Sequence, residues 1–456
     1  MRKGSLTNSQ LAELNALVQV GKCDELKNIC YGIELDDFQT LLAKWMLITR
    51  KFICTLDTGL GKTIIASAVM KYMRDNKITK RFVYVVENAG MAQTMMKIQQ
   101  YTDLRVFTCT ASIDDAYKLG YTKENFDVLM INYQALQSYG VSLYLLQHID
   151  EFDTLIFDEC QWLSEINNSN TWEIAKQMRK HFRDLFMFSA TPFRTNPLQL
   201  LKQVEMLDSN ILGNINEYIK DKVTRSVMYE ITDWHGLDTI KSDLTLFVNG
   251  FSREELGIDI KYNAIANISE ALPEQENIEA KDMTQIKGFS NAESMHNTIN
   301  IVLEHIDDFE QGIIYCSTNV NKALLRDELI RNGVSVEIID GTLSNKKERD
   351  IVQSRYLNGE ISVLIINITT TLDLPSSYCI FYELCDAGTV TQFIGRCIRG
   401  LADSDLTVYF MLVADTYEID YFYNSIYRKS VYLQKILGKD DRLMNAIKKQ
   451  IDKEVP

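Results

Sequence analysis

The chain has 456 residues, about two to three times the length of a usual single domain, so we expect two domains with an appendage. Hydrophobic residues make up 46% of the sequence and there are only 5 prolines, which supports sizeable cores and excludes a largely disordered chain. A formal net charge of -14 excludes a protein that coats nucleic acid indiscriminately through its Lys and Arg side chains.

The sequence carries no sign of export. No run of about 18 uncharged apolar residues is present, and the start of the chain lacks the apolar stretch of a signal peptide. The 9 cysteines show no Cys-x-x-Cys pair and no zinc spacing, so we interpret them as reduced core residues. We therefore expect a cytoplasmic protein without a membrane span.

Short apolar runs that are typical of buried strands alternate with helical patterns twice along the chain, over 35–205 and again over 291–427. Such alternation indicates parallel sheets that are covered by helices on both faces. An N-terminal helical segment is expected over 1–34, before the first series. The predicted fold class is therefore α/β, with two tandem lobes of similar size.

Two further segments differ from the lobes in charge. The inter-lobe segment, 206–290, turns acidic, with 15 Asp or Glu against 8 Lys or Arg from Asp208 to Ser290, and we expect some structure of its own there. The C-terminal segment, 428–456, is basic, with 8 Lys or Arg against 4 Asp or Glu. We interpret it as a solvated helical tail, with a surface for a protein partner as the alternative.

The stretch TLDTGLGKTII in the first lobe reads as a strand, a glycine-containing loop and the start of a helix. In such a loop backbone N–H groups and the helix dipole face an anion, Lys62 reaches the terminal phosphates, and Thr63 gives an oxygen to Mg²⁺. The full phosphate-loop pattern would have a small residue at Leu56, and here Gly59 and Gly61 give the loop its flexibility instead. The stretch predicts a nucleotide site.

A later strand of the same lobe ends on two carboxylates, in TLIFDECQWL. Phosphate-loop enzymes need an aspartate that faces magnesium and a group that positions water for attack on the γ-phosphate. Asp158 fits the metal role, and Glu159 fits the water-activating role. A solvated turn is the alternative for the carboxylate pair alone, and the GKT stretch in the same lobe favours the catalytic interpretation.

Polar and basic groups further along the chain extend this pattern. Ser189 and Thr191 end the next strand of the first lobe with two hydroxyls. In the second lobe the stretch TQFIGRCIRG places Gln392, Arg396 and Arg399 on one predicted helix. Arginines at this spacing are ordinary surface residues in many helices. A guanidinium from a second lobe can also stabilise the charge that develops on a γ-phosphate.

Together these stretches resemble the motifs of superfamily 2 helicases and translocases, over most of the chain. In chain order the matches are Gln39 as the glutamine that reads adenine, Gly61 to Thr63 as motif I, Asp158 to Gln161 as motif II, Ser189 to Thr191 as motif III, and Gln392 to Arg399 as motif VI. The resemblance implies two RecA-like lobes, ATP and Mg²⁺ as cofactors, and a nucleic-acid partner. Within the superfamily the chain is most similar to chromatin-remodelling translocases and to phage-encoded DNA helicases, and the latter would place it in the cytoplasm of a host.

The chain departs from the superfamily pattern in two places. Cys160 and Gln161 stand where better-known branches have Ala-Asp or Ala-His at the end of motif II. An amide can both donate and accept, so Gln161 is a candidate for coupling the nucleotide site to motif III. Around motif V the stretch TTTLDLPSS lacks the usual glycines, which leaves Thr371 and Asp373 as candidates for nucleic-acid and nucleotide contacts.

The implied function is that of an ATP hydrolase that works as a motor on nucleic acid, as a DNA helicase or a double-strand DNA translocase. An RNA-dependent ATPase of the same fold is the first alternative, because the motor motifs touch phosphates and do not distinguish the two nucleic acids. A nucleotide-gated nucleic-acid-binding protein without motor activity is the second. Loss of Lys62, Glu159 or Arg396 would be expected of such a protein, and all three are present.

Overall fold

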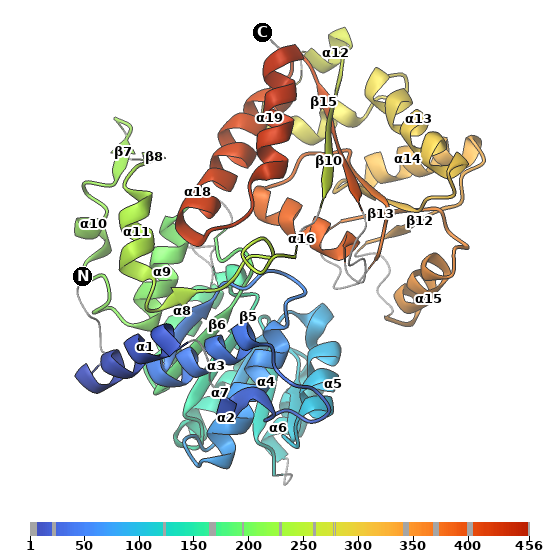
Figure 1. The fold of residues 1–456 in the computed structure, drawn as a ribbon. Coiled ribbons are helices and arrows are strands. Elements are labelled where there is room, and N and C mark those ends of the chain that lie inside the picture. Colours follow the sequence, from blue (N-terminus) through green and yellow to red (C-terminus); the bar gives the residue numbers. More distant parts are fainter. Residues whose placement is uncertain are drawn as a thin grey trace. The chain divides into compact units, whose positions relative to one another are not determined.

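The computed structural model describes residues 7–20, 24–121, 125–163, 170–193, 196–227, 230–258, 261–276, 278, 280–340, 346–367, 374–398 and 405–454. The chain divides into two compact units (Figure 1). Unit 1 comprises Met1–Ser252 and the short segment Lys435–Gly438, and unit 2 comprises Arg253–Gln434 and Lys439–Pro456. Each unit contains one parallel sheet of its own, which confirms the predicted α/β class with two tandem lobes.

The sheet of unit 1 has seven strands, all paired in parallel, in the order β3-β4-β2-β5-β6-β1-β9. These strands are β1 (Lys51–Cys54), β2 (Phe82–Val86), β3 (Val106–Cys109), β4 (Val128–Asn132), β5 (Thr154–Asp158), β6 (Asp184–Phe188) and β9 (Val248–Asn249). Strands β2, β4, β5 and β6 are buried along their whole length, as continuous apolar runs predict. Because the strands are parallel, their carboxyl ends meet at one edge, where Asp158 of β5 pairs with Phe188 of β6.

Helices connect these strands. They are α1 (Asn8–Val20), α2 (Asp24–Lys27), α3 (Asp37–Thr49), α4 (Lys62–Asp75), α5 (Met91–Tyr101), α6 (Ile113–Tyr121), α7 (Tyr139–Gln147), α8 (Asn170–Arg179), α9 (Leu198–Leu207), α10 (Ile215–Tyr218) and α11 (Leu237–Leu244). Short 3-10 turns are η1 (Asn88–Gly90), η2 (Ala135–Gln137), η3 (Ile149–Glu151) and η4 (Cys160–Leu163). A separate antiparallel hairpin consists of β7 (Val223–Arg225) and β8 (Ile231–Trp234).

The sheet of unit 2 has six strands, also all paired in parallel, in the order β10-β15-β14-β11-β13-β12. They are β10 (Tyr262–Ser269), β11 (Gly312–Tyr315), β12 (Val336–Ile339), β13 (Val363–Ile366), β14 (Tyr378–Phe381) and β15 (Leu406–Val413). The helical elements are α12 (Pro273–Glu276), η5 (Ala280–Lys287), α13 (Glu293–Asp307), α14 (Asn319–Arg331), α15 (Lys346–Leu357), α16 (Ala387–Cys397), α17 (Tyr417–Tyr421), the π-helical turn η6 (Phe422–Tyr427), α18 (Arg428–Leu437) and α19 (Arg442–Glu454).

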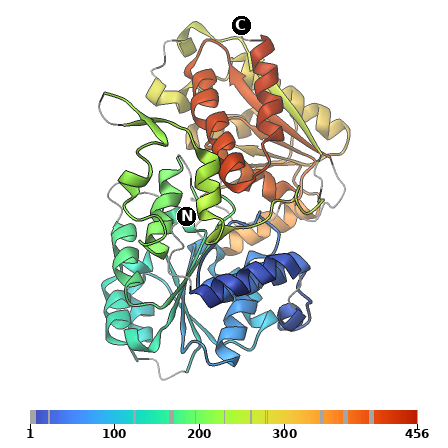
Figure 2. The ribbon, with the colours of Figure 1, turned by 60° about the vertical axis from the view of Figure 1, so that its left-hand side comes forward.

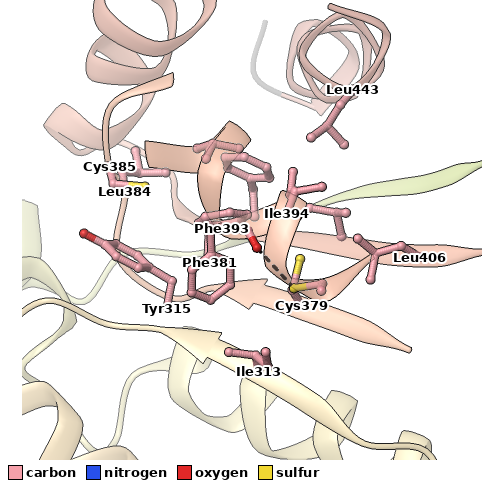
Figure 3. Packing of buried hydrophobic residues seen from close by; sticks show 14 of the residues in the cluster. Ile313, Tyr315, Cys379, Phe381, Leu384, Cys385, Phe393, Ile394, Leu406 and Leu443 are labelled. Carbon is pink, nitrogen blue, oxygen red and sulfur yellow. Dashed lines mark hydrogen bonds between the residues drawn. The ribbon is translucent and has the colours of Figure 1, made fainter. Parts of the chain in front are cut away.

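The sheet of unit 2 is covered on both faces. Successive side chains of β11 point to opposite faces, so Ile313 and Ile314 belong to different hydrophobic clusters. Phe393 of α16 and Leu443 of α19 lie in the same cluster as Ile313 (Figure 3). Helices α13 and α14 cover the other face (Figure 2). Met295 of α13 belongs to the same hydrophobic cluster as Ile314. This two-sided burial explains why the strands read as apolar runs in the sequence.

The structure divides the residues that were expected as an inter-lobe segment. Strand β9 joins the sheet of unit 1 beside β1, whereas β10 joins the sheet of unit 2 beside β15. Each of these strands lies at one edge of its sheet, and its neighbour in that sheet is far away along the chain. The sequence pattern over 206–290 therefore looks irregular. The segment is therefore structured, but as parts of two units.

The C-terminal segment is helical, as predicted, but the expectation of a solvated tail is wrong for one of its faces. Helix α19 packs against β10 and contributes its apolar side chains to the core of unit 2. Ile447 and Ile451 are fully buried there. Gln450 fixes the contact, since its Nε2 donates to the Ala264 carbonyl at 2.6 Å and its Oε1 accepts from the Ala266 N–H at 2.9 Å.

Two further expectations concern cysteines and membrane spans. Eight cysteines in the described residues are free and buried, in keeping with reduced core residues. Among the described residues no helix is long and apolar enough to cross a membrane.

Candidate functional site

The loop between β1 and α4 is built around two glycines in the left-handed conformation. Gly59 has a φ of 81° and Gly61 a φ of 91°, which residues with a side chain rarely adopt. A Cβ on Gly61 would also lie 2.5 Å from Nε2 of Gln39. The Lys62 ammonium reaches back across the loop and donates to the Leu56 carbonyl at 3.3 Å. The loop thus holds a cationic group at a helix N-terminus, an arrangement that suits phosphate.

Gln39 holds this loop from the first turn of α3 and is only 6% exposed. Its Nε2 donates to the Leu60 carbonyl at 3.1 Å, and its Oε1 accepts from the Asp36 N–H at 3.0 Å. Both ends of the carboxamide are therefore engaged within the protein. The contact with adenine that the family resemblance implies stays a prediction, and it would replace one of these two bonds.

Residues 249–251, close to the boundary of unit 1, hold the first half of the loop between β1 and α4. The Thr55 N–H donates to the Asn249 carbonyl at 2.9 Å, and the Asp57 N–H donates to the Phe251 carbonyl at 3.3 Å. Gly250 approaches so closely that a Cβ on it would lie 2.5 Å from the carbonyl carbon of Thr55. No local sequence pattern predicts this support, because the two segments are far apart along the chain.

Asp158 ends β5 in a position that is only 8% exposed. Burial, and after it the negative charge of Glu159, raises the pKa of the Asp158 carboxyl to about 7, and the Lys62 ammonium acts in the opposite direction. The Tyr84 hydroxyl donates to Oδ2 of Asp158 at 3.4 Å, and the Tyr133 hydroxyl donates to its backbone carbonyl at 2.7 Å. Because burial disfavours the charged form of this carboxyl, a nearby cation would stabilise that form. Carboxylate oxygens are hard ligands of the kind that bind Mg²⁺.

A continuous chain of hydrogen bonds joins the ends of β5 and β6. Gln161 donates from Nε2 to Oε2 of Glu159 at 2.9 Å and accepts at Oε1 from the Ser189 hydroxyl at 2.6 Å. The Ser189 oxygen accepts in turn from the Thr191 N–H at 3.0 Å. Gln161, Ser189 and Thr191 are buried. The structure therefore brings the predicted motif II and motif III residues into direct contact through Gln161.

The residues predicted in the second lobe lie on or beyond α16 of unit 2. Gln392 and Arg396 are one helical turn apart and both are partly exposed. Arg399 lies outside the described residues, as do Thr371 and Asp373 of the motif V stretch. The roles of these residues in nucleotide or nucleic-acid contact stay predictions.

Tyr84 and Tyr133 are site residues that sequence reasoning did not single out. Tyr84 lies inside the apolar run of β2 and Tyr133 directly follows β4, so each reads as an ordinary core residue. Both are at most 5% exposed, and burial raises their pKa well above the ordinary value, so both stay protonated hydrogen-bond donors. The position of Tyr133 at a strand end was the one available signal.

Known proteins resemble this chain along most of its length. The family model described as "Type III restriction enzyme, res subunit" matches residues 34–194. "Uncharacterized ATP-dependent helicase YqhH" of Bacillus subtilis (strain 168) is 20% identical over 453 residues, covering 87% of this chain and 78% of that protein. The structure of S. cerevisiae Dbp5 bound to RNA and ADP BeF3 superposes with a TM-score of 0.52 at 14% identity, covering 98% of this chain and 97% of Dbp5. These similarities support a superfamily 2 helicase or translocase with two RecA-like lobes.

The chain has the two tandem RecA-like lobes that its motifs predicted, and the predicted resemblance is confirmed. The Bacillus subtilis relative is described as an ATP-dependent helicase, and such enzymes are ATP hydrolases, which supports an ATP hydrolase here. The structure of a Sulfolobus solfataricus SWI2/SNF2 ATPase core in complex with dsDNA matches 92% of this chain at 15% identity, with a TM-score of 0.43.

Proposed function

We propose that this helicase is a DNA-stimulated motor, which couples ATP hydrolysis in unit 1 to movement along DNA or remodelling of it. The observation that carries the proposal is the unbroken hydrogen-bond chain from Glu159 through Gln161 and Ser189 to the Thr191 backbone. A carboxylate placed to orient water is thereby joined to the end of the neighbouring strand. Such a connection would give the hydrolysis step a direct route to the loop that follows β6.

The nucleotide would bind at the loop between β1 and α4. Lys62 would leave the Leu56 carbonyl and take up the terminal phosphates, a better partner for an ammonium than a neutral carbonyl. Asp158 and Thr63 would hold Mg²⁺, with phosphate and water oxygens supplying its other ligands. Asp158 would have to lose its proton to hold the ion, because that carboxyl has a raised pKa, and the ion would supply charge neutralisation at the phosphates.

Glu159 would orient the water that attacks the γ-phosphate, and Gln161 keeps its Oε2 in place through a 2.9 Å bond. Arg396 and Arg399 would contribute from unit 2, where a guanidinium stabilises charge that develops only in the transition state. Gln392, on the same helix as Arg396, would contact the nucleotide. These roles rest on the motif resemblance and on the position of the two described side chains on α16.

Uncharged polar groups at the carboxyl ends of neighbouring strands would contact the nucleic acid. Asn132 ends β4, where its Nδ2 donates to Oδ1 of Asn88 at 3.1 Å and its Oδ1 accepts from the Ala135 N–H at 2.8 Å. The pair joins the turns that follow β2 and β4, at the same edge of the sheet as the phosphate loop. Phosphate contacts from amides and backbone groups suit a protein of net charge -14.

An RNA-dependent ATPase of the same fold is the competing function. The stretches FDVLMINYQAL and IIDGTLSNKKERDIV resemble chromatin-remodelling translocases and favour DNA. The test is the ATPase rate of the full chain with matched single-stranded and double-stranded DNA and RNA, with Lys62→Ala as the inactive control. We expect DNA to raise the rate more than RNA does. A larger rise with RNA would reverse the assignment, and binding without any ATP turnover would indicate a nucleotide-gated binding protein instead.

A further inference from the structure

Gln203 is a buried amide that joins the turn after β5 to the loop after β6. It lies on α9 and is 0% exposed. Its Nε2 donates to the Pro192 carbonyl at 2.7 Å and to the Cys160 carbonyl at 3.4 Å, and its Oε1 accepts from the Cys160 thiol at 3.4 Å. Both N–H donors of its NH₂ group therefore bind loops of the candidate site, one loop each.

The turn that Gln203 holds contains a strained residue. Glu159 has a φ of 49°, a left-handed conformation that is strained for a residue with a side chain. Such a conformation persists only where its neighbours determine it. On one side the Tyr133 hydroxyl donates to the Asp158 carbonyl at 2.7 Å, and on the other Gln203 engages both the thiol and the carbonyl of Cys160. The strained carboxylate residue is therefore fixed on both sides.

The second loop that Gln203 holds contains Thr191, the last member of the hydrogen-bond chain from Glu159. Pro192 is the next residue, and its carbonyl receives the shortest of the Gln203 bonds. The chain through Gln161 and the contacts of Gln203 therefore connect the same two loops twice. The first connection consists of Gln161 and Ser189, at the candidate site. The second is Gln203, which lies on α9.

We propose that Gln203 is a positioning residue for ATP hydrolysis, which sets the distance between the turn of Glu159 and the loop of Thr191. The inference rests on the proposed motor function. Without Gln203 the Glu159 turn can relax from its left-handed conformation, and the carboxylate that orients water shifts with it. The phosphate loop makes none of these contacts in the described residues, so nucleotide binding does not depend on Gln203.

The proposal also explains a departure from the family pattern. Cys160 stands where better-known branches have alanine, and its thiol gives Oε1 of Gln203 a donor that alanine cannot provide. Burial raises the pKa of the Cys160 thiol well above its ordinary value, so the sulfur keeps the proton that it donates. Cys160 and Gln203 therefore act as a pair, and exchanging one of them should change the effect of exchanging the other.

The test compares Gln203→Met with Gln275→Met in the full chain. Gln275 is a matched control: it is 0% exposed, belongs to unit 2, donates to the Ile286 carbonyl at 2.6 Å and accepts from the Leu272 N–H at 2.8 Å. We expect Gln203→Met to lower the kcat of DNA-stimulated ATP hydrolysis by about 10- to 100-fold, as a small misplacement of a catalytic group does. The KM for ATP should change by less than about twofold, since Lys62 and its loop are untouched.

Gln275→Met should lose about as much stability as Gln203→Met but keep its kcat. This comparison distinguishes a positioning role of Gln203 from a general loss of folding. Rates are normalised to sites that bind a fluorescent ADP analogue, so partly unfolded protein does not lower kcat. Gln203→Asn keeps the amide but shortens it by one methylene, so it tests the same bonds if the Met variant fails to fold. Cys160→Ala alone should lower kcat, and it should have no further effect in a Gln203→Met background.

The proposal is overturned if both Gln203 variants keep the kcat of the natural protein. It is also overturned if Gln203→Met and Gln275→Met change KM and kcat to the same extent. A natural protein that shows no stimulation by any nucleic acid would instead contradict the motor function. In that case the basal kcat still decides the role of Gln203, because the positioning of Glu159 serves hydrolysis with or without a polymer.

Discussion

The buried Asp158 carboxyl should give the nucleotide-free protein a characteristic pH dependence. Burial and the charge of Glu159 raise its pKa from 3.8 to about 7. Between these values the unfolded chain has lost the proton and the folded protein keeps it, so this group lowers the free energy of unfolding as the pH rises. Asp158→Asn removes that loss and should be more stable than the natural protein at pH 8, by up to about 4 kcal/mol.

Urea denaturation of both proteins at pH 5 and pH 8, without nucleotide or magnesium, measures this effect. The stability difference between Asp158→Asn and the natural protein should be larger at pH 8 than at pH 5. An equal difference at the two pH values would show that the Asp158 carboxyl is already charged at pH 5.

The Gln161 side chain links Glu159 to Ser189, and its loss should uncouple hydrolysis from nucleic acid. Gln161→Ala removes a 2.9 Å and a 2.6 Å hydrogen bond together. We expect DNA to stimulate its ATPase about tenfold less than it stimulates the natural protein, with a smaller change in the basal rate, because one tenfold step corresponds to about 1.4 kcal/mol of coupling. Ser189→Ala should behave alike, and full stimulation of either variant would rule out the link.

Among the elements, strand β9 and the residues after it act as a backing for the phosphate loop. Gly250 leaves no room for a side chain, since a Cβ would lie 2.5 Å from the Thr55 carbonyl carbon. Gly250→Ala should therefore displace the loop and weaken binding of a fluorescent ADP analogue by about tenfold, in line with an overpacking cost of about 1–3 kcal/mol. Gly120→Ala is the control, because a Cβ there meets nothing within 4 Å. Equal affinities of the two variants would contradict the backing role.

Helix α19 contributes to the core of unit 2, although its composition suggested a solvated tail. Ile447→Ala should reduce the free energy of unfolding by about 2–5 kcal/mol, because the side chain is fully buried against the sheet. Lys449→Ala, on the exposed face of the same helix, should change it by less than about 0.5 kcal/mol. Chemical denaturation of the two variants measures this, and similar effects would show that α19 does not pack as described.

The elements also show how far the sequence predicts this structure. Apolar runs and the GKT and DE stretches located the strands and the nucleotide site, because a parallel sheet needs continuous apolar strands and phosphate needs a glycine loop. The supports of the site were not predictable. Gln203 meets Cys160 across 43 residues of sequence, and Gly250 meets Thr55 across more, so no local pattern reports either contact. The buried face of α19 was missed because its charges are more conspicuous than its four buried apolar residues.

At the scale of the whole molecule, the charge distribution argues for weak and sequence-independent contact with nucleic acid. The net charge is -14, and cations of the basic C-terminal segment pair with carboxylates, as Lys429 does with Asp386 at 2.8 Å and Arg442 with Asp440 at 2.8 Å. The segment is therefore less basic toward its surroundings than its composition suggests. This agrees with the proposed contact through polar strand ends, which would suit a motor that must release its track in every cycle.

The most direct test of a motor built on Lys62 and Glu159 is the ATPase rate of the full chain with and without DNA, compared between the natural protein and Glu159→Gln. DNA should raise the rate of the natural protein. Glu159→Gln should bind ATP with similar affinity and lose about 10²- to 10⁴-fold in kcat, the usual contribution of a group that activates water. A Glu159→Gln protein that hydrolyses ATP at the natural rate, or a natural protein indifferent to DNA and RNA alike, would contradict it.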